Sequence, residues 1–459
     1  MTRFGNLPLL PTTVVGSHGK ASWWFAGVRE HEKGVWGEGD LAEMLDDAAD
    51  TAIRDMTKAD IDVITDGEVR RLDGYVDSYY TVIKNIQPIE IKRKDGPWGY
   101  DQQTRYVATG KIEVPEGGLG IIDEFKYGME HSDKPLKATC AGPLTFGSRI
   151  HPGDQYKGTV DVAERFCEVI NEELKGLVAA GAEFIQIDEP ARGNLSGEEM
   201  ARLFNKATEG VKAKLAFHIC FGNRFGRGRF QRTYANYFPG ALEAKTDQFV
   251  LEFASREMSE IEKVGEWLSD GRELGAGLVD VKSFYTDTAE DVAKRIHKTL
   301  EYIKPEKLWL NPDCGFGWSP RYMCNQKIGA LADGAKLARK QLGRLASALQ
   351  ARHPGAAASL REGLEETLTV QALGITGALY RTLRTTNPIE NLNGSVAHYS
   401  RNVKRWGDGQ MVLRWVASAL SDAATRMRKL RGCGQMRTLL KALDGRRPES
   451  DNGAVLKAA

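Results

Sequence analysis

Short apolar runs rich in β-branched residues alternate with longer amphipathic stretches along about the first 341 residues of the chain. Runs of this length suit buried strands, and the amphipathic stretches have the length and period of helices packed against them. Strands are expected at residues 13–15, 61–64, 136–140, 183–187, 214–219, 248–252, 275–281 and 307–310. Helices are expected at residues 41–58, 160–180, 196–211, 256–268, 288–303 and 320–342. Eight strands that alternate with helices predict an α/β fold of the (β/α)8 barrel class.

Two segments depart from this alternation. Residues from about 80 to 132 are rich in Gly, Pro, Lys and Asp, and we expect an insertion that is either a lid at the barrel mouth or a structural elaboration. Residues 343–445 are rich in Ala, Arg and Leu and predict a small, mainly helical appendage, whereas residues 446–459 predict a disordered tail. The chain of 459 residues is thus expected to hold two domains, a barrel over residues 1–342 and the appendage behind it.

Composition and charge narrow the classes of protein that fit this pattern. No apolar run approaches the ~20 residues of a membrane span, and the first residues lack the features of a secretory signal, so we expect a soluble cytoplasmic protein. Six scattered cysteines do not suggest a disulfide framework and are expected as reduced thiols, some on a metal. Residues 343–459 hold 18 Lys and Arg against 9 Asp and Glu, which leaves 45 against 53 for the preceding residues. A basic tail behind an acidic body suggests two pieces of different origin.

The sharpest chemical signal is the sequence FHIC at the end of the fifth predicted strand. Residues two apart on a strand face the same way, so His218 and Cys220 are expected to converge on one point. Glu252 ends the next strand and Cys314 follows the last one, which places all four at the C-terminal end of the barrel. This nitrogen, sulfur and oxygen donor set predicts a Zn²⁺ site, although a His-x-Cys pair alone more often means a buried histidine and an inert cysteine. Zinc would hold a thiol substrate as its thiolate, and Glu252 is the ligand that we expect the substrate to displace.

Further polar residues end other predicted strands. Glu68 follows the second strand in the sequence DGE, and Asp188 follows the fourth in DEP. Carboxylates that face a barrel mouth can bind an ammonium group or act as general bases, and the alternative is N-capping of the next helix. Gly16 and Ser17 end the first strand, where backbone N–H groups and a hydroxyl can bind a substrate carboxylate, although a simple turn fits equally.

Seven runs, LPTTVVGS, ITDGEVRR, GPLTF, FIQIDEPA, FHIC, VLE and NPDCG, occur in the order found in the catalytic barrel of cobalamin-independent methionine synthase, which residues 7–342 resemble. The resemblance implies transfer of a methyl group to homocysteine from a methylated folate or a corrinoid. It implies zinc ligation by His218, Cys220, Glu252 and Cys314, and it implies binding of the amino acid by Ser17, Glu68 and Asp188. Lys282 stands where the long enzymes of the family have a histidine thought to donate a proton, so it joins Glu68 and Asp188 as a candidate catalytic residue. This chain has only one barrel, and a basic insertion, NRFGRGRFQRTYANY, separates Cys220 from Glu252.

Single-barrel relatives of that family offer an alternative activity. The epoxyalkane:coenzyme M transferases use similar zinc chemistry to open an epoxide with a thiol, and the run VKSFYTDTAED is compatible with that branch. Homocysteine needs carboxylates near its ammonium group, whereas coenzyme M needs cations near its sulfonate. Because Glu68 and Asp188 supply carboxylates, we favour homocysteine as the thiol.

The tail resembles the C-terminal end of a Mutator-type insertion-sequence transposase, through GLEETLTV, LGITGALYRTLRTTNPIENLN and SRNVKRWGDGQMVLRWVASAL. Glu390 resembles the third acid of that family's metal-binding triad, and the other two acids belong to an upstream core that this chain lacks, so we expect a catalytically inactive tail. Leu413, Val416 and Leu420 predict an amphipathic helix in need of a partner. A DNA-binding remnant is the rival interpretation, through Arg401, Lys404 and Arg405 beside Trp406, with at most weak and salt-sensitive binding.

Overall fold

The computed structural model describes residues 4–5, 7–72, 75–89, 104–190, 195–223, 231–317, 319–349 and 409–426, together with residues 396, 398–401, 403 and 440. The chain divides into two compact units, residues 1–348 and residues 349–459. Several features that the sequence singled out lie outside the described residues: most of the expected helical appendage, including Glu390, Lys404, Arg405 and Trp406, part of the basic insertion after Cys220, and the tail at 446–459.

The first unit is a barrel of parallel strands. Six strands pair in the order β3 (Ala138–Ala141), β5 (Phe184–Asp188), β6 (Lys214–Ile219), β7 (Gln248–Glu252), β8 (Glu273–Val279) and β9 (Leu308–Pro312). Parallel bridges from Thr12 to Leu310, from Thr13 to Val63 and from Ile64 to Leu136 join β9 to β3 through two further segments. These bridges close the ring, which confirms the (β/α)8 class, but the first two predicted strands are short bridges rather than strands.

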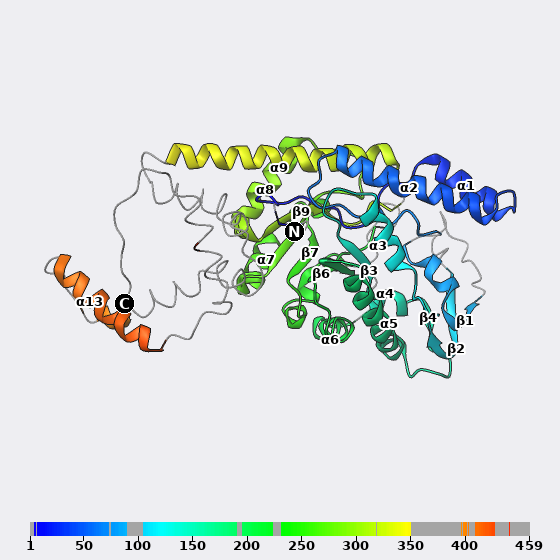
Figure 1. The fold of residues 1–459 in the computed structure, drawn as a ribbon, viewed down its shortest axis with the longest axis horizontal. Helices are drawn as coiled ribbons and strands as arrows, with labels where there is room; N and C mark the ends of the chain where they lie inside the picture. The colour runs from blue at the N-terminus through cyan, green and yellow to red at the C-terminus, as the bar shows by residue number, and fades with distance from the viewer. Residues whose placement is uncertain are drawn as a thin grey trace. The chain divides into compact units, whose positions relative to one another are not determined.

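Helices surround the strands, as Figure 1 shows. They are α1 (Ser22–Glu32), α2 (Glu38–Lys58), α3 (Ile121–Glu130), α4 (Pro143–Gly147), α5 (Thr159–Ala179), α6 (Gly197–Ala207), α7 (Ile261–Trp267), α8 (Ala289–Leu300) and α9 (Arg321–Leu349). Capping boxes begin two of them, Ser196 with Glu199 at α6 and Thr288 with Asp291 at α8.

Two of the expected helices differ most from the structure, one in where it begins and the other in where it ends. The helix expected at 256–268 begins only at Ile261, because Glu257, Met258 and Glu260 have φ of 53°, 63° and 66°, values that no right-handed helix contains. Helix α9 continues past residue 342, where the barrel was expected to end, as far as Leu349. The boundary between the two units therefore follows the last turns of α9.

The segment expected to be an insertion forms a small sheet and a helix. Strands β1 (Lys84–Ile89) and β2 (Arg105–Glu113) pair antiparallel, and β2 also pairs in parallel with β4 (Ile150–His151), which follows β3. Helix α3 comes next in the chain after β2. Residues 90–103, between β1 and β2, are outside the described part of the chain.

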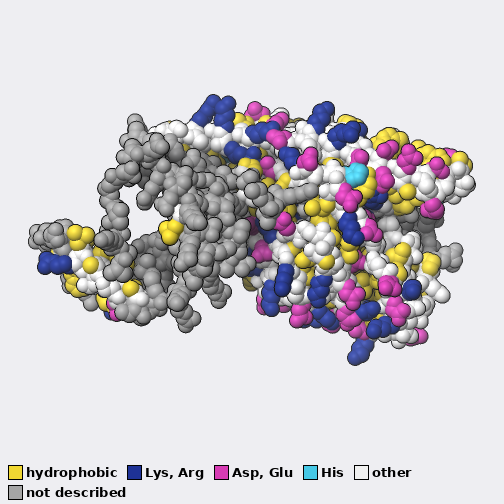
Figure 2. Space-filling view, viewed as in Figure 1, with side chains coloured by type: hydrophobic (Ala, Val, Ile, Leu, Met, Phe, Trp, Pro, Cys, Tyr) yellow, Lys and Arg dark blue, Asp and Glu magenta, His cyan; other side chains and the backbone are white. Residues whose placement is uncertain are grey.

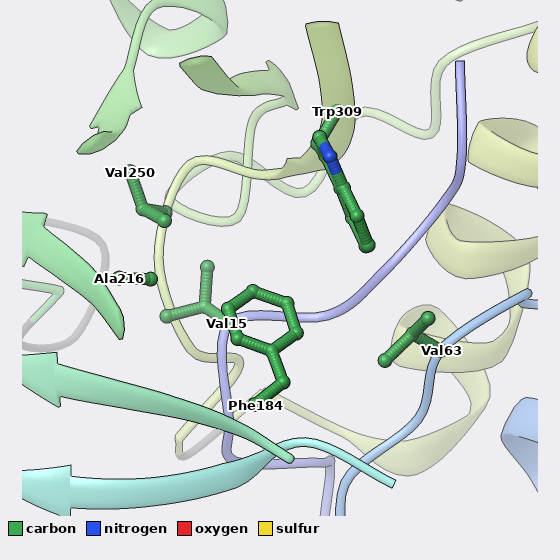
Figure 3. Packing of buried hydrophobic residues seen from close by; sticks show 6 residues of the cluster. All are labelled: Val15, Val63, Phe184, Ala216, Val250 and Trp309. Carbon is green, nitrogen blue, oxygen red and sulfur yellow. The ribbon is translucent and has the colours of Figure 1, made fainter. Parts of the chain in front are cut away.

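The interior of the barrel is apolar at one level. Figure 3 shows six buried side chains from different segments of the barrel that point toward one another: Val15, Val63, Phe184, Ala216, Val250 and Trp309. Because side chains alternate along a strand, the residues two positions later, such as Gln186, His218 and Glu252, face the same interior one level higher. The apolar cluster therefore forms a floor beneath a polar layer at the C-terminal end of the strands.

Charged side chains of both signs lie on the surface of the barrel unit, and apolar side chains are exposed in the second unit. Figure 2 shows acidic and basic side chains interspersed over one face of the barrel unit. In the second unit, helix α13 (Gly409–Arg426) covers the expected amphipathic segment, and Leu413 and Leu420 are exposed at 62% and 39%. No helix in the described ranges combines the length and apolar character that crossing a membrane requires.

Candidate active site

His218 and Cys220 lie together at the C-terminal end of β6, as their spacing predicts. Both side chains are buried. The Nδ1 atom of His218 lies 3.2 Å from the carbonyl oxygen of Val250, so the proton is expected on Nδ1 and the lone pair on Nε2. Nε2 is buried and has no hydrogen-bond partner among the described residues. A buried nitrogen lone pair with nothing to accept from is what a metal ligand requires.

Cys314 follows β9 and completes a group of three possible ligands. Its Sγ lies 3.4 Å from Sγ of Cys220, too far for a disulfide. The ligand atoms of His218, Cys220 and Cys314 all lie within 4.8 Å of one another. The hydrogen bond from Cys314 lowers the pKa of Cys220 well below its ordinary value, against the effect of burial. One imidazole and two thiols in this arrangement fit the donor set of a zinc site.

Glu252 lies beside this group without belonging to it. Its carboxylate is fully buried and accepts a hydrogen bond from the backbone N–H of Phe221, the residue after Cys220, at 3.1 Å. Lys282, in the loop after β8, places Nζ 2.8 Å from Glu252 Oε2. The structure thus brings three of the four expected ligands together and pairs the fourth with Lys282, so its role as a ligand stays a prediction.

Glu68 occupies a strained position at the end of the second barrel segment. Its φ is 53°, a left-handed conformation that is uncommon for residues other than glycine and that is frequent at functional sites. Its Oε1 accepts a hydrogen bond from Thr139 Oγ1 at 2.8 Å and lies 2.9 Å from Arg71. Burial raises the pKa of Glu68 to about 7, although the charge of Arg71 opposes this. Gly16 lies against this carboxylate, since a Cβ atom there would come within 2.9 Å of Glu68 Cδ.

Asp188 connects the carboxylate side of the site to the thiol side. In the β5–β6 register it is the direct neighbour of His218. Its Oδ1 accepts from Gln186 Nε2 at 2.6 Å and its Oδ2 from the Tyr75 hydroxyl at 2.8 Å. Burial raises the pKa of Asp188, opposed by the charge of His218. An amino acid bound at Asp188 would therefore have its side chain within reach of His218.

A capping role falls on Glu189, the residue after Asp188, and the helix that it caps is α4, which precedes β5 in the chain, and not the next helix. Glu189 accepts hydrogen bonds from the backbone N–H groups of Leu144 at 2.9 Å and Thr145 at 2.8 Å, in the first turn of α4. The Asp188 carboxylate instead accepts hydrogen bonds from the side chains of Gln186 and Tyr75. The two acids of the sequence DEP therefore have separate roles, one in capping and one facing the site.

Ser17 joins the first barrel segment to the loop that carries Cys314. Its Oγ accepts from the backbone N–H of Gly317 at 3.0 Å, and its carbonyl accepts from Phe316 at 2.9 Å. The next residue, His18, is buried. Its Nδ1 lies 3.1 Å from Cys324 Sγ, and its Nε2 lies 3.2 Å from Asp55 Oδ2. The Ser17 hydroxyl is therefore fixed in position by the loop after β9, and the residue that follows it is fixed by helices α2 and α9.

Sequence reasoning missed three residues of this site: Arg71, Tyr75 and Thr139. Arg71 is buried and donates to the backbone oxygen of Thr139 at 3.0 Å, besides its ion pairs with Glu68 and Glu124. Arg71 lies within the run ITDGEVRR, so its proximity to Glu68 was a usable signal. Tyr75 and Thr139 carry no local pattern that distinguishes them from ordinary core or loop residues.

Comparisons with known proteins give matches for both parts of the chain. The family model for the catalytic domain of cobalamin-independent synthase matches residues 10–337, and the model for the Mutator family of transposases matches residues 327–429. The methionine synthase of Saccharolobus solfataricus is 36% identical over 347 residues, which cover 74% of this chain and 98% of that protein. The methionine synthase of Sulfurisphaera tokodaii is 33% identical over 343 residues, 73% of this chain and 95% of that protein. Among solved structures, a B12-independent methionine synthase from Shewanella sp. W3-18-1, in complex with selenomethionine, is similar with a TM-score of 0.61 and 26% identity, over 73% of this chain and 99% of that chain.

Proposed function

Because this chain belongs to the cobalamin-independent methionine synthase family, we propose that it is a zinc-dependent methyltransferase that methylates the thiol of homocysteine to give methionine. The observation that carries the proposal is the group of His218, Cys220 and Cys314, whose ligand atoms lie within 4.8 Å of one another and in which the buried Nε2 of His218 has no hydrogen-bond partner among the described residues. Bound zinc would hold the substrate sulfur as a thiolate, which is the nucleophilic form.

The protein's own residues would bind the amino-acid part of the substrate. Glu68 and Asp188 supply two buried carboxylates for the ammonium group, and Asp188 is the register neighbour of His218. Gly16 and Ser17 lie beside Glu68 and the Cys314 loop, where they would bind the substrate carboxylate. Fixing the ammonium and carboxylate in this way would direct the sulfur toward the metal ligands.

Coenzyme M is the weaker candidate for the thiol. A sulfonate needs a cation, and two cations of the site are paired with carboxylates, Lys282 with Glu252 and Arg71 with Glu68 and Glu124. For the methyl donor we propose a methylated folate or a corrinoid, and assays with each donor in turn distinguish the two.

We propose no catalysis for the transposase-like tail. The match to the transposase family begins at residue 327, inside α9, and the motifs of residues 343–459 resemble the C-terminal end of that family. A metal-dependent phosphoryl transfer needs acids that would precede this point.

Zinc content per chain tests the proposed function. Purified wild-type protein should hold about one zinc per chain, and His218→Ala, Cys220→Ser and Cys314→Ser should each lose most of it. Cys167→Ser is the matched control, because Cys167 is buried in α5 with its Sγ 3.4 Å from the Leu203 carbonyl, and it should keep full zinc. Wild-type protein without zinc after reconstitution under reducing conditions would remove the proposal, and so would loaded protein that methylates no homocysteine with either donor.

A further inference from the structure

Lys137 is buried inside the barrel, below the proposed amino-acid site. It lies immediately before β3, its side chain is 1% exposed, and its Nζ lies 5.6 Å from the centre of the Phe184 ring, which belongs to the apolar floor in Figure 3. Nζ donates to two uncharged acceptors, the carbonyl of Val14 and Oε1 of Gln186, at 2.6 Å each. Lysine is rarely buried to this degree, so its position calls for an explanation in the groups above it.

Gln186 connects Lys137 to Asp188. It is 0% exposed and lies two residues before Asp188 on β5, so the two side chains face the same interior. Its Nε2 donates to Asp188 Oδ1 at 2.6 Å and to the carbonyl of Val15 at 2.7 Å. A lysine ammonium can only donate, so the amide atom that faces it must be the oxygen, and the amide nitrogen is left to face Asp188. Lys137 thereby fixes the orientation of the Gln186 amide.

This orientation favours the ionised form of Asp188. Its Oδ1 accepts from Gln186, and its Oδ2 accepts from the Tyr75 hydroxyl at 2.8 Å. Hydrogen bonds donated to both oxygens of a carboxyl group stabilise the carboxylate. Burial lowers the pKa of Lys137, and the charges of Asp188 and Glu68 oppose this and favour the ammonium form. The lysine and the carboxylates above it therefore stabilise each other's charged forms.

The same two side chains hold the backbone of the first barrel segment. The strand bridges of that segment lie at residues 12–13. After them, Lys137 donates to the carbonyl of Val14, and Gln186 donates to the carbonyl that follows. Side-chain donors thus satisfy backbone groups that a longer strand would pair in a ladder. The backbone held in this way leads directly into residues 16–17, where we place the substrate carboxylate.

We propose that Lys137 and Gln186 are positioning residues that fix both sides of the amino-acid site from below, and that they thereby select a thiol carrying an ammonium and a carboxylate group. This inference rests on the function proposed above. The ammonium side is fixed through Asp188, and the carboxylate side through the backbone before Gly16. Because Lys137 and Gln186 are buried, they act through these groups.

Charge alone would give Lys137 the opposite effect on binding. A cation below the site repels the ammonium group of the substrate, so removing it would strengthen binding if its charge were all that mattered. Removing its hydrogen bonds should weaken binding instead, because the Gln186 amide loses its fixed orientation and Asp188 loses a steady donor. The direction of the change in Lys137→Met therefore distinguishes the two roles.

Titration calorimetry of the zinc-loaded protein with two thiols tests the proposal. Homocysteine carries both amino-acid groups, and 2-mercaptoethanol carries neither. Lys137→Met and Gln186→Met should each weaken homocysteine binding about tenfold and change 2-mercaptoethanol binding by less than about threefold, with zinc content unchanged. Lys134→Met is the matched control, because Lys134 lies in the same segment and pairs with Asp60 at 3.3 Å nearer the surface, and it should change the binding of neither thiol.

The two variants also test whether the residues act as one chain. Gln186→Met keeps the lysine and its bond to Val14, so it tests the link to Asp188 even where Lys137→Met fails to fold. The double variant should bind homocysteine within about threefold of Lys137→Met, because that variant already disrupts the whole chain. A further tenfold loss in the double variant would show independent effects and overturn the inference.

Two other results also overturn it. Equal losses for both thiols would mean a general loosening of the barrel, and unchanged or tighter homocysteine binding in either single variant would mean that these hydrogen bonds do not serve the site. Wild-type protein separates this failure from that of the proposed function. If wild-type protein holds no zinc, or does not bind homocysteine more tightly than 2-mercaptoethanol, the proposed function fails and the inference fails with it.

Discussion

Replacing Gly16 by alanine would put a methyl group where the Glu68 carboxylate lies. The new Cβ would lie 2.9 Å from Glu68 Cδ, and nearer still to Oε1, whereas ordinary contacts begin at 3.4 Å. The carboxyl carbon must therefore move by 0.5 Å, the difference between these two values, and Oε1 by about 1 Å. Such a shift lengthens the 2.8 Å hydrogen bond from Thr139 and disturbs the ion pair with Arg71.

Misplacing a binding group by about 1 Å can cost about 100-fold, or about 2.7 kcal/mol. Titration calorimetry of the zinc-loaded protein with homocysteine should therefore show Gly16→Ala binding about 100-fold more weakly, with zinc content unchanged. Gly329→Ala is the matched control, because a Cβ at this position of α9 meets nothing within 4 Å. It should bind homocysteine as wild type does and gain up to about 1 kcal/mol of stability against urea.

A double-variant cycle identifies the cause of the weaker binding. In a Glu68→Ala background the clash is gone, so adding Gly16→Ala should change the affinity by less than about threefold. Wild-type affinity in Gly16→Ala would refute the reasoning, since it would mean that the Glu68 carboxylate does not contact the bound amino acid.

Three further predictions concern the surroundings of the site. Tyr75→Phe removes the 2.8 Å hydrogen bond to Asp188, so KM for homocysteine should rise about tenfold while zinc content stays constant. An unchanged KM would show that Tyr75 does not contribute to homocysteine binding. Burial lowers the pKa of His18, but the charges of Cys324 and Asp55 outweigh it and raise the pKa to about 9. The raised pKa of His18 stabilises the folded protein fully below about pH 6.5, and this stabilisation is lost as the pH rises through about 9. The difference in unfolding free energy between wild type and His18→Gln should therefore shrink by a few kcal/mol over that range. A constant difference in urea titrations would contradict this prediction. The basic tail should give no mobility shift with duplex DNA at about 150 mM salt, and a retained complex at that salt would revive the DNA-binding interpretation.

The alternation of apolar and amphipathic runs was enough to predict the barrel, because each strand is buried on both faces and reads as a continuous apolar run. It could not predict that the first two strands shrink to isolated bridges, since the length of a ladder depends on twist and on the partner strand. It also extended α7 backward over three residues with positive φ, because their side chains fit a helical pattern and only the backbone excludes it.

The candidate site likewise has a part that the sequence could predict and a part that it could not. A spacing of two on a strand places His218 and Cys220 on one face, so their convergence followed from geometry alone. The partner of Glu252 depends on which rotamer a lysine from the next segment adopts, and no sequence pattern reports that. The ion pair of Arg71 with Glu68 is likewise a matter of side-chain packing around a strained loop.

The two family matches meet within helix α9, and the backbone there is one continuous helix. Residues 327–337 fall within both matches, yet the helix runs on without interruption to Leu349. Arg339, beyond the synthase match, donates to the carbonyls of Leu9 and Leu10 and pairs with Asp62, while Gln341 contacts His297 of α8. Residues from outside the enzyme's own family match therefore fasten the first segment of its barrel. A dissection of this protein that cut at residue 337 would sever these fastenings, whereas a cut after residue 349 would leave the barrel with its closing helix intact.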